Sequence, residues 1–248
     1  MTKVITFSEL DEDLFSQYKV AVQNAFPKII LCSKVIENYW DRVESYFPEC
    51  QLFLIDDSNQ LLGFVNSLPL HWDRPLSTLP DQGWDWMLEK GISDYENAIL
   101  PNTLGGLQII VTKDHRGKGY SKVLISEAKA TVAKLGFAHF VIPIRPTFKD
   151  RFPNMKMTDY IQKQENGKTY DPWIRTHMKS GAEIIRVCAK AMRIDGDIEF
   201  WKGLTDQNIE EEGDYIISGA LNPVRIDPRN NYGVYFEDNI WIRYLTEI

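Results

Sequence analysis

Apolar residues recur at helical spacing in two segments near the start of the chain. In residues 11–26 they lie three to four positions apart, acidic residues occupy the first turn, and Pro27 follows the segment. A second such pattern covers residues 33–47 and begins at Ser33, a favoured N-cap residue. The pattern therefore predicts two helices here, after a short strand over residues 3–7.

The middle of the chain alternates between continuous apolar runs and a helical pattern. Runs at 51–55 and 61–68 flank a polar loop and predict a β-hairpin. Runs at 104–111 and 137–144 predict two buried strands, and helical spacing over 119–135 predicts a helix between them.

The other segments are less regular. Residues 71–103 hold two prolines near their start and three tryptophans, and they predict a loop followed by a short helix. Residues 145–170 predict an irregular polar insertion. After it the pattern predicts a helix over 171–181 with Asp171 as N-cap and Pro172 as first residue, a strand over 182–194, a short helix near 197–204 and a last strand near 233–245.

This order of elements predicts a single α/β domain over residues 1–248, with a mixed sheet and helices on both faces. The hydrophobic content of 44% and charged content of 25% are ordinary for a globular protein. The net charge of −7 argues against a nucleic-acid partner bound through a broad cationic face. The three cysteines have no metal-ligand spacing, and we see neither a signal peptide nor a membrane span. We therefore expect a cytoplasmic protein without a metal site.

One short segment has the composition of a binding loop. The residues "KDHRGKGYSKVL" (113–124) connect an apolar run to a helix, with small residues and cations in alternation. Such a loop directs backbone N–H groups toward one point at a helix N-terminus, where phosphates bind. A basic, glycine-containing surface turn is the alternative, and neither GxxxxGK[ST] nor GxGxxG is present. The central positions are Arg116, Gly117, Lys118, Gly119, Tyr120 and Ser121.

This loop resembles the R/Q-x-x-G-x-G/A signature of the GNAT superfamily of acyl-CoA-dependent N-acyltransferases. Arg116 and Gly119 match the signature, whereas Ser121 replaces the usual Gly or Ala. The order of strands and helices over the whole chain is also similar to that of the family. The resemblance implies a mostly antiparallel sheet splayed between its fourth and fifth strands. It also implies direct transfer of an acyl group from acetyl-CoA, or another acyl-CoA, to an amine or other small nucleophile.

The resemblance assigns roles to particular positions. The amides from Gly117 to Ser121 would hold the CoA pyrophosphate, and the strand residues Ile109, Ile110 and Val111 would pair with the pantetheine arm. A strand-end amide near Val111 would polarise the thioester carbonyl as an oxyanion donor does. A homodimer is compatible with the family.

The part of the chain from about residue 60 to its end resembles a GNAT subgroup related to loading-module domains of polyketide synthases. Those domains act on acyl thioesters of CoA and an acyl carrier protein, and some decarboxylate malonyl groups. By position, Thr147 and His177 are the catalytic candidates. A histidine of near-neutral pKa can move a proton at physiological pH, whereas a packed helical histidine and an ordinary turn threonine are the alternatives.

Other residues are candidates for a substrate pocket. Arg145 and Arg193 can hold an acidic group through bidentate contacts, or they can be structural ion-pair partners. The tryptophans can wall a pocket for an apolar acyl chain, or they can pack in the core. Glu237 and Asp238 can act as a base for the amine, or they can lie in a turn. The tryptophans are Trp72, Trp84 and Trp86.

Three functions remain open at this point. The first is an acyltransferase acting on a small-molecule amine. The second is a decarboxylase or S-acyltransferase that works with an acyl carrier protein. The third is a non-catalytic acyl-CoA-binding protein, because one fold can host several functions.

Overall fold

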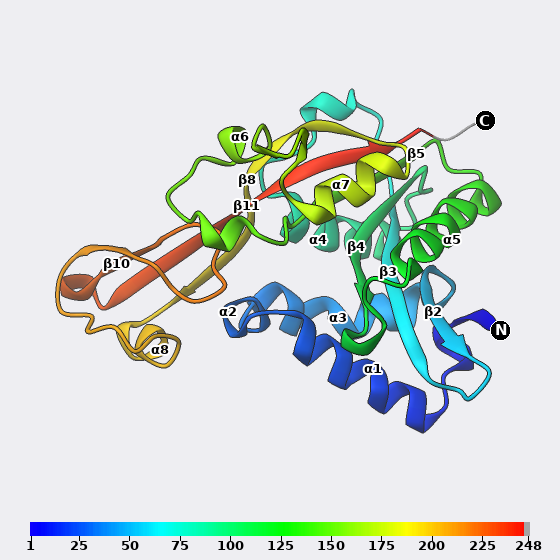
Figure 1. The fold of residues 1–248 in the computed structure, drawn as a ribbon, viewed down its shortest axis with the longest axis horizontal. Helices are drawn as coiled ribbons and strands as arrows, with labels where there is room; N and C mark the ends of the chain where they lie inside the picture. Colours follow the sequence, from blue (N-terminus) through cyan, green and yellow to red (C-terminus); the bar gives the residue numbers. More distant parts are fainter. Residues whose placement is uncertain (246–248) are drawn as a thin grey trace.

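The computed structural model describes residues 1–245 and has a central mixed sheet (Figure 1). Its strands are β1 (Thr2–Thr6), β2 (Gln51–Asp56), β3 (Leu61–Leu70), β4 (Thr103–Val111), β5 (His139–Ile144), β8 (Ala182–Gly196), β9 (Gly213–Tyr215), β10 (Val224–Asp227) and β11 (Tyr232–Tyr244). They lie in the order β1-β2-β3-β4-β5-β11-β10-β9, and β8 pairs with the other edge of β11. In Figure 1, β8, β10 and β11 extend as an arm beyond the rest of the sheet.

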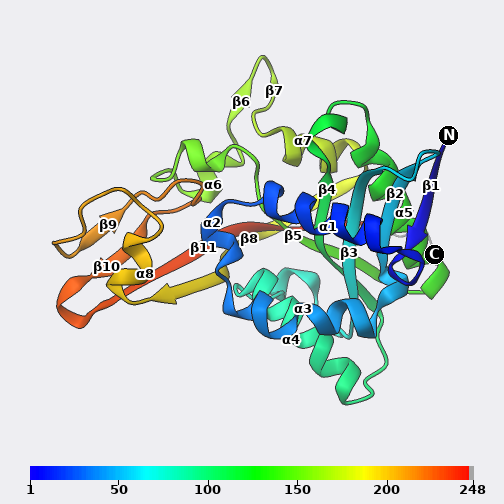
Figure 2. The same cartoon turned by 90° about the horizontal axis from the view of Figure 1, so that it is seen from below.

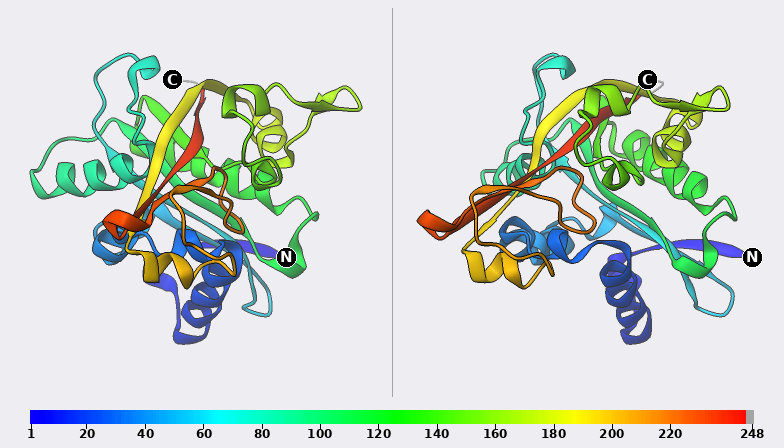
Figure 3. Two further views of the ribbon diagram at one scale, coloured as in Figure 1. Left: turned by 90° about the vertical axis from the view of Figure 1, so that its left-hand side faces the viewer. Right: turned by 60° about the vertical axis from the view of Figure 1, so that its left-hand side comes forward.

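Helices cover both faces of this sheet. The helices are α1 (Glu12–Ala25), α2 (Lys28–Leu31), α3 (Lys34–Tyr46), α4 (Gly83–Glu96), α5 (Tyr120–Leu135), α6 (Met157–Tyr160), α7 (Pro172–Lys179) and α8 (Ile198–Lys202). Helices α1, α3 and α4 lie on one face, and α5 and α7 lie on the other (Figures 2 and 3). The predicted α/β fold with helices on both faces is therefore confirmed.

Local sequence signals determine where several helices begin and end. The Asp11 carboxylate accepts a hydrogen bond from the Leu14 amide at 2.8 Å and caps α1. Asp171 caps α7 in the same way, with Pro172 as the first helical residue. Gly136 ends α5 in the left-handed conformation, where the absence of a Cβ removes the steric cost. These caps explain why the predicted helix boundaries agree closely with the observed ones.

The least regular segments contain more structure than we predicted. Helix α4 has 14 residues, so the expectation of only a short helix within 71–103 was wrong. The predicted irregular insertion contains α6 and a small hairpin of β6 (Gln164–Glu165) and β7 (Lys168–Thr169), which projects beyond α7 in Figure 2. Strands β9 and β10 were not predicted, because they are too short to show a periodic pattern.

The sheet opens between β4 and β5, as predicted. These two strands are parallel and pair only from Thr103 to Gly105, which face His139 to Val141. The pairing of β4 with β3 shows a register shift between Asn66 and Ser67, which leaves Leu107 as an extra residue in β4. The β-bulge therefore lies just where the two strands separate, and the remainder of β4 is paired on one edge only.

Candidate functional site

The loop after β4 forms a cradle of unpaired backbone donors at the start of α5. Gly117 and Gly119 adopt φ angles of +78° and +86°, and a Cβ added at either would meet no atom within 4 Å. Within residues 1–245, no backbone carbonyl accepts a hydrogen bond from the amides of 117–121. A helix N-terminus with free N–H groups and a partial positive charge favours a phosphate ligand. The residues present therefore fit the pyrophosphate of CoA.

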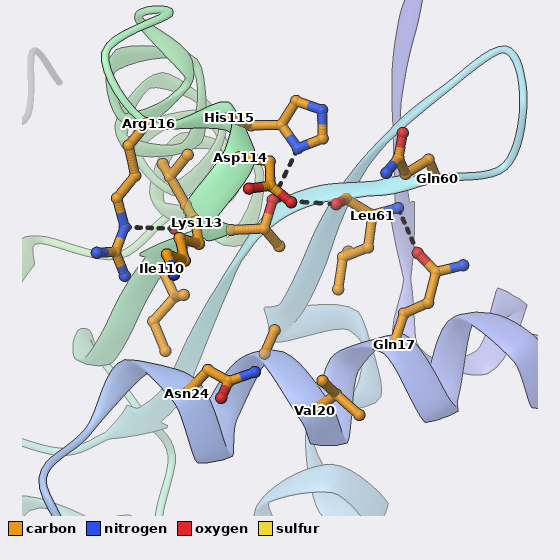
Figure 4. Close-up of a pocket in the computed structure, with 13 residues that line it drawn as sticks. Gln17, Val20, Asn24, Gln60, Leu61, Ile110, Lys113, Asp114, His115 and Arg116 are labelled. Atoms are coloured by element: carbon orange, nitrogen blue, oxygen red, sulfur yellow. Dashed lines mark hydrogen bonds between the residues drawn. The ribbon is translucent and has the colours of Figure 1, made fainter.

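Hydrogen bonds fix the base of this loop against the strands (Figure 4). The Thr112 amide donates to the Leu62 carbonyl at 3.0 Å. The Thr112 hydroxyl lies 2.9 Å from Nδ1 of His115, as Figure 4 shows. The Arg116 guanidinium donates through Nε to the Val111 carbonyl at 3.3 Å, and the rest of this exposed group has no recorded partner among the described residues. A hollow of about 270 Å³ separates the loop from α1. These bonds therefore hold the loop in shape and leave the backbone amides of 117–121 free to donate to a ligand.

The end of β4 presents its side chains to both faces of the sheet. Ile110 packs with Tyr18 and Phe64 in the cluster beneath α1. Ile109 and Val111 are partly buried against the larger core cluster. Since β5 has already separated from this part of β4, the backbone edge of these residues faces the opening of the sheet. The predicted pairing of this edge with a pantetheine arm stays a prediction.

Two stacked tryptophans, one from α4 and one from α3, lie against the β-bulge of β4. The Trp84 indole donates a hydrogen bond of 2.8 Å to the carbonyl of Leu107, the bulged residue of β4. Trp40 of α3 stacks on Trp84 with an interplanar angle of 6°. The Trp40 indole and the Tyr18 hydroxyl both donate to the Glu44 carboxylate, and burial raises the pKa of that carboxyl. Trp84 therefore has a defined position next to the point where β4 and β5 separate.

A second cavity of about 550 Å³ lies between α4, β8 and the start of α3. We refer to it as the α4–β8 cavity. The predicted pocket residue Arg193 lines it, and Trp86 provides an aromatic wall. The buried Trp72 packs edge-on against Trp86, with ring centroids 5.3 Å apart, and so supports this wall from behind. The charged side chains that line the cavity are Lys34, Asp85, Glu89, Lys190, Arg193 and Asp195.

The structure places Thr147 and His177 in different surroundings. Thr147 is exposed, whereas His177 is fully buried and shares a 2.7 Å hydrogen bond with the Tyr244 hydroxyl. Burial lowers the pKa of His177 to about 3, and its Nε2 has no partner among the described residues. No hydrogen bond joins the two side chains within the described chain, and a joint catalytic role stays a prediction.

Arg145 belongs to a buried polar network. Its guanidinium contacts both carboxylate oxygens of Glu237, at 2.9 and 3.1 Å, and the Gly219 carbonyl. Glu237 is fully buried and also accepts from the Tyr235 hydroxyl at 2.9 Å. The adjacent Asp238 is partly buried, and burial raises the pKa of its carboxyl. These contacts engage Nε and Nη2 of Arg145, so the side chain is held as a structural ion-pair partner of Glu237.

The sequence did not reveal the acids of the α4–β8 cavity. Asp85 and Glu89 lie one turn apart on a helix whose length was underestimated, within "GWDWMLEK". The one available signal was an acid between two tryptophans at the start of an apolar helix. The side of α4 that meets the sheet is decided by tertiary contacts, so the spacing could not show that Asp85 is buried.

Comparisons with known proteins agree with this arrangement. No family model matches the sequence. The chain is 28% identical over 249 residues to arginine N-acetyltransferase avaD of Aspergillus versicolor, covering 89% of this chain and 85% of the relative. It superimposes on the loading GNATL domain of CurA from Lyngbya majuscula with a TM-score of 0.62 at 13% identity, covering 99% and 98% of the chains. The GphF GNAT-like decarboxylase, solved with isobutyryl-CoA, superimposes with a TM-score of 0.59 at 12% identity, covering the full length of both chains.

The splayed sheet and the free amides after β4 occur in a fold that this chain shares with the GNAT-like domains of CurA and GphF. The chain is also similar to an N-acetyltransferase over most of its length, and it shares its fold with a GNAT-like loading domain. Within the described part of the chain, none of the helices has both the length and the apolar character needed to span a membrane.

Proposed function

We propose that the protein transfers an acyl group, with acetyl as the first candidate, from CoA to an amine nitrogen of a small molecule. The observation that carries this proposal is the cradle of free amides over 117–121 at the open end of the β4–β5 cleft. A pyrophosphate held there leaves the pantetheine arm to enter the cleft beside β4. The acyl group would then lie near Trp84, which is bonded to the Leu107 carbonyl at the β-bulge.

The reaction is a direct transfer. The amine nitrogen attacks the thioester carbonyl carbon, a C–N bond forms and the C–S bond breaks. The nitrogen loses one proton, and the thiolate sulfur gains one. This chain contributes mainly position: the glycine loop fixes one substrate and the cleft aligns the other, which removes much of the entropic cost. A strand-end amide near Val111 would donate to the carbonyl oxygen as negative charge develops.

The named function of the sequence relative supports nitrogen as the acceptor atom. That relative is an arginine N-acetyltransferase, and its similarity covers most of both chains. The decarboxylase alternative relies on Thr147 and His177, of which the first is exposed and the second is enclosed in the core. The two structural neighbours support the fold alone at 12–13% identity. We therefore favour N-acyl transfer to a small molecule.

The first experiment measures thermal unfolding with CoA, acetyl-CoA and malonyl-CoA, for wild type and Gly119→Glu. A ligand that binds the folded state raises Tm, by the equivalent of about 2.7 kcal/mol at a hundred times Kd. The matched control is Gly136→Glu at the other end of α5, since Gly136 is also left-handed with open space around it.

We expect acetyl-CoA to raise Tm for wild type and for Gly136→Glu, and not for Gly119→Glu. A carboxylate side chain introduced at position 119 would occupy the cradle and repel a phosphate, whereas one introduced at position 136 lies a whole helix away. An equal response of all three proteins would show that acetyl-CoA binds elsewhere. A wild type unaffected at millimolar acetyl-CoA would refute the proposed function.

A further inference from the structure

We propose that the α4–β8 cavity is the acceptor subsite and that it takes an amino acid with a cationic side chain. This inference rests on the proposed N-acyl transfer and names the substrate class for it. The side-chain cation would lie against Asp85 and Glu89, and the carboxylate of the amino acid would lie against Lys190.

The topology places this cavity at the open end of the cleft. Strand β11 runs antiparallel to β5, and Ile240 lies opposite Ile144, the last residue of β5. Phe236, which lines the cavity, therefore lies beyond the carboxyl end of β5, in the direction in which β4 and β5 diverge. Helix α4 links the two regions, because Trp84 bonds to the Leu107 carbonyl while the next residue, Asp85, lines the cavity.

The cavity contains a buried carboxylate that lacks a partner for one oxygen. Asp85 is 8% exposed, and one oxygen accepts a hydrogen bond of 2.8 Å from the Arg193 amide. The other oxygen, Oδ1, has no donor among residues 1–245. A buried polar atom without a partner is costly, so it favours a ligand that brings a donor. Glu89, one helical turn on, is exposed and has no recorded partner among the described residues.

The cations around the cavity are mostly neutralised by neighbouring groups. The Arg193 guanidinium lies 3.6 Å from Asp195 and 3.0 Å from the Tyr232 hydroxyl. The Lys34 ammonium also contacts Asp195, at 3.4 Å. Neither Asp85 nor Glu89 forms an ion pair within the described chain.

Lys190 differs from the other cations. Its ammonium lies 5.4 Å from the centre of the Phe236 ring, and no carboxylate within the described residues pairs with it. A ligand that satisfies both this ammonium and the two acids carries a carboxylate and a cation. An α-amino acid with a guanidinium or ammonium side chain has that pattern.

The size and walls of the cavity agree with such a ligand. Its volume of about 550 Å³ lies within the range of about 300–1,000 Å³ typical of small-molecule sites. Trp86 and Phe236 offer aromatic rings on which a guanidinium can stack. An apolar acyl chain would instead leave the charged groups without partners.

The test is steady-state kinetics at saturating acetyl-CoA, following CoA release with a thiol reagent. The acceptors are L-arginine, L-lysine, agmatine without the carboxylate, and L-citrulline with a neutral side chain. The enzymes are wild type, Asp85→Asn, Glu89→Gln and Lys190→Met. The matched control is Glu199→Gln, another exposed helical glutamate, on α8 away from the cavity. Calorimetric titration of L-arginine into the protein with CoA measures acceptor binding without turnover.

We expect Asp85→Asn to raise KM for L-arginine at least tenfold and to leave KM for acetyl-CoA unchanged. Citrulline should be an acceptor at least tenfold poorer than arginine for wild type. Lys190→Met should weaken the binding of arginine but not that of agmatine. Glu199→Gln should behave as wild type. A wild type that binds acetyl-CoA but neither binds nor acetylates L-arginine or L-lysine would overturn the inference, as would an unchanged KM in both acid variants. Either result would leave the proposed acyltransferase function intact, whereas absence of acetyl-CoA binding would remove that function itself.

Discussion

Replacement of Asp85 by Asn should change how stability depends on pH. The Asp85 carboxyl has a pKa raised from 3.8 to about 7, chiefly by burial. The Arg193 amide opposes this rise by its hydrogen bond, and the negative charges of Glu89 and Glu237 add to it. Asn has nearly the same shape, and its amide oxygen can still accept from the Arg193 amide.

The sign follows from which state binds the proton more tightly. The folded protein holds the Asp85 proton up to about pH 7, whereas the unfolded chain releases it near 3.8. Wild type therefore loses stability as pH rises through this window, and the loss is complete above it. A shift of about 3 pKa units corresponds to about 4 kcal/mol in total, of which about 2.5 kcal/mol falls between pH 5 and 8.

The assay is urea unfolding of both proteins at pH 5, 6, 7 and 8, followed by tryptophan fluorescence and analysed for the free energy of unfolding. Other titrating groups are common to both proteins, so their effects cancel in the difference. We expect Asp85→Asn to gain about 2.5 kcal/mol relative to wild type between pH 5 and 8.

A difference that stays constant within about 0.5 kcal/mol over this pH range would refute the reasoning. It would mean that water or a neighbouring cation stabilises the Asp85 carboxylate in the folded state. The unpaired Oδ1 would then no longer be an argument for a cationic ligand in the cavity.

Three further predictions concern the buried groups and the cleft. Burial lowers the pKa of His177 to about 3, so the unfolded state binds the proton first as pH falls. Wild type should therefore lose about 2 kcal/mol of stability relative to His177→Gln between pH 7 and pH 5, as measured by urea unfolding. A difference that stays constant over this pH range would contradict this. Arg145→Met leaves Glu237 buried without its cation and should cost about 3–5 kcal/mol in the same assay, and a loss below about 1 kcal/mol would argue against a structural pair. Gly106→Val should lower Tm by the equivalent of about 1–3 kcal/mol, because its Cβ would lie 2.8 Å from Ile142, and an unchanged Tm would show that β5 can move aside.

Much of the fold could be predicted because local signals and tertiary structure agree. The N-cap side chains of Ser33 and Asp171 occupy their predicted places at the starts of α3 and α7. The splay was predicted from the family resemblance, and the limited pairing of β4 with β5 confirms it. Strands β9 and β10 were missed because three or four residues give no periodicity, and their pairing depends on distant residues.

The candidate site was only partly accessible from the sequence. The amide cradle could be anticipated, since glycines at 117 and 119 mark backbone conformations that other residues avoid. The ion pair of Arg145 with Glu237 joins residues 92 positions apart, so no local pattern could show it. The burial of His177 depends on packing against Tyr244, which is likewise distant in sequence. Burial and pairing, rather than residue type, decide which candidates are free to react.

Under the proposed function, the cradle over 117–121 would recognise its ligand through main-chain atoms, and this has a consequence for how the protein can change over evolutionary time. An amide donor is the same whichever side chain its residue carries. Substitution should therefore be tolerated across most of the loop, with tight restriction only at the two left-handed glycines. Sequence identity can then drift far while the recognised shape persists, and this agrees with a shared fold at 12–13% identity. Mutational scanning of the loop should show two intolerant positions separated by a permissive one.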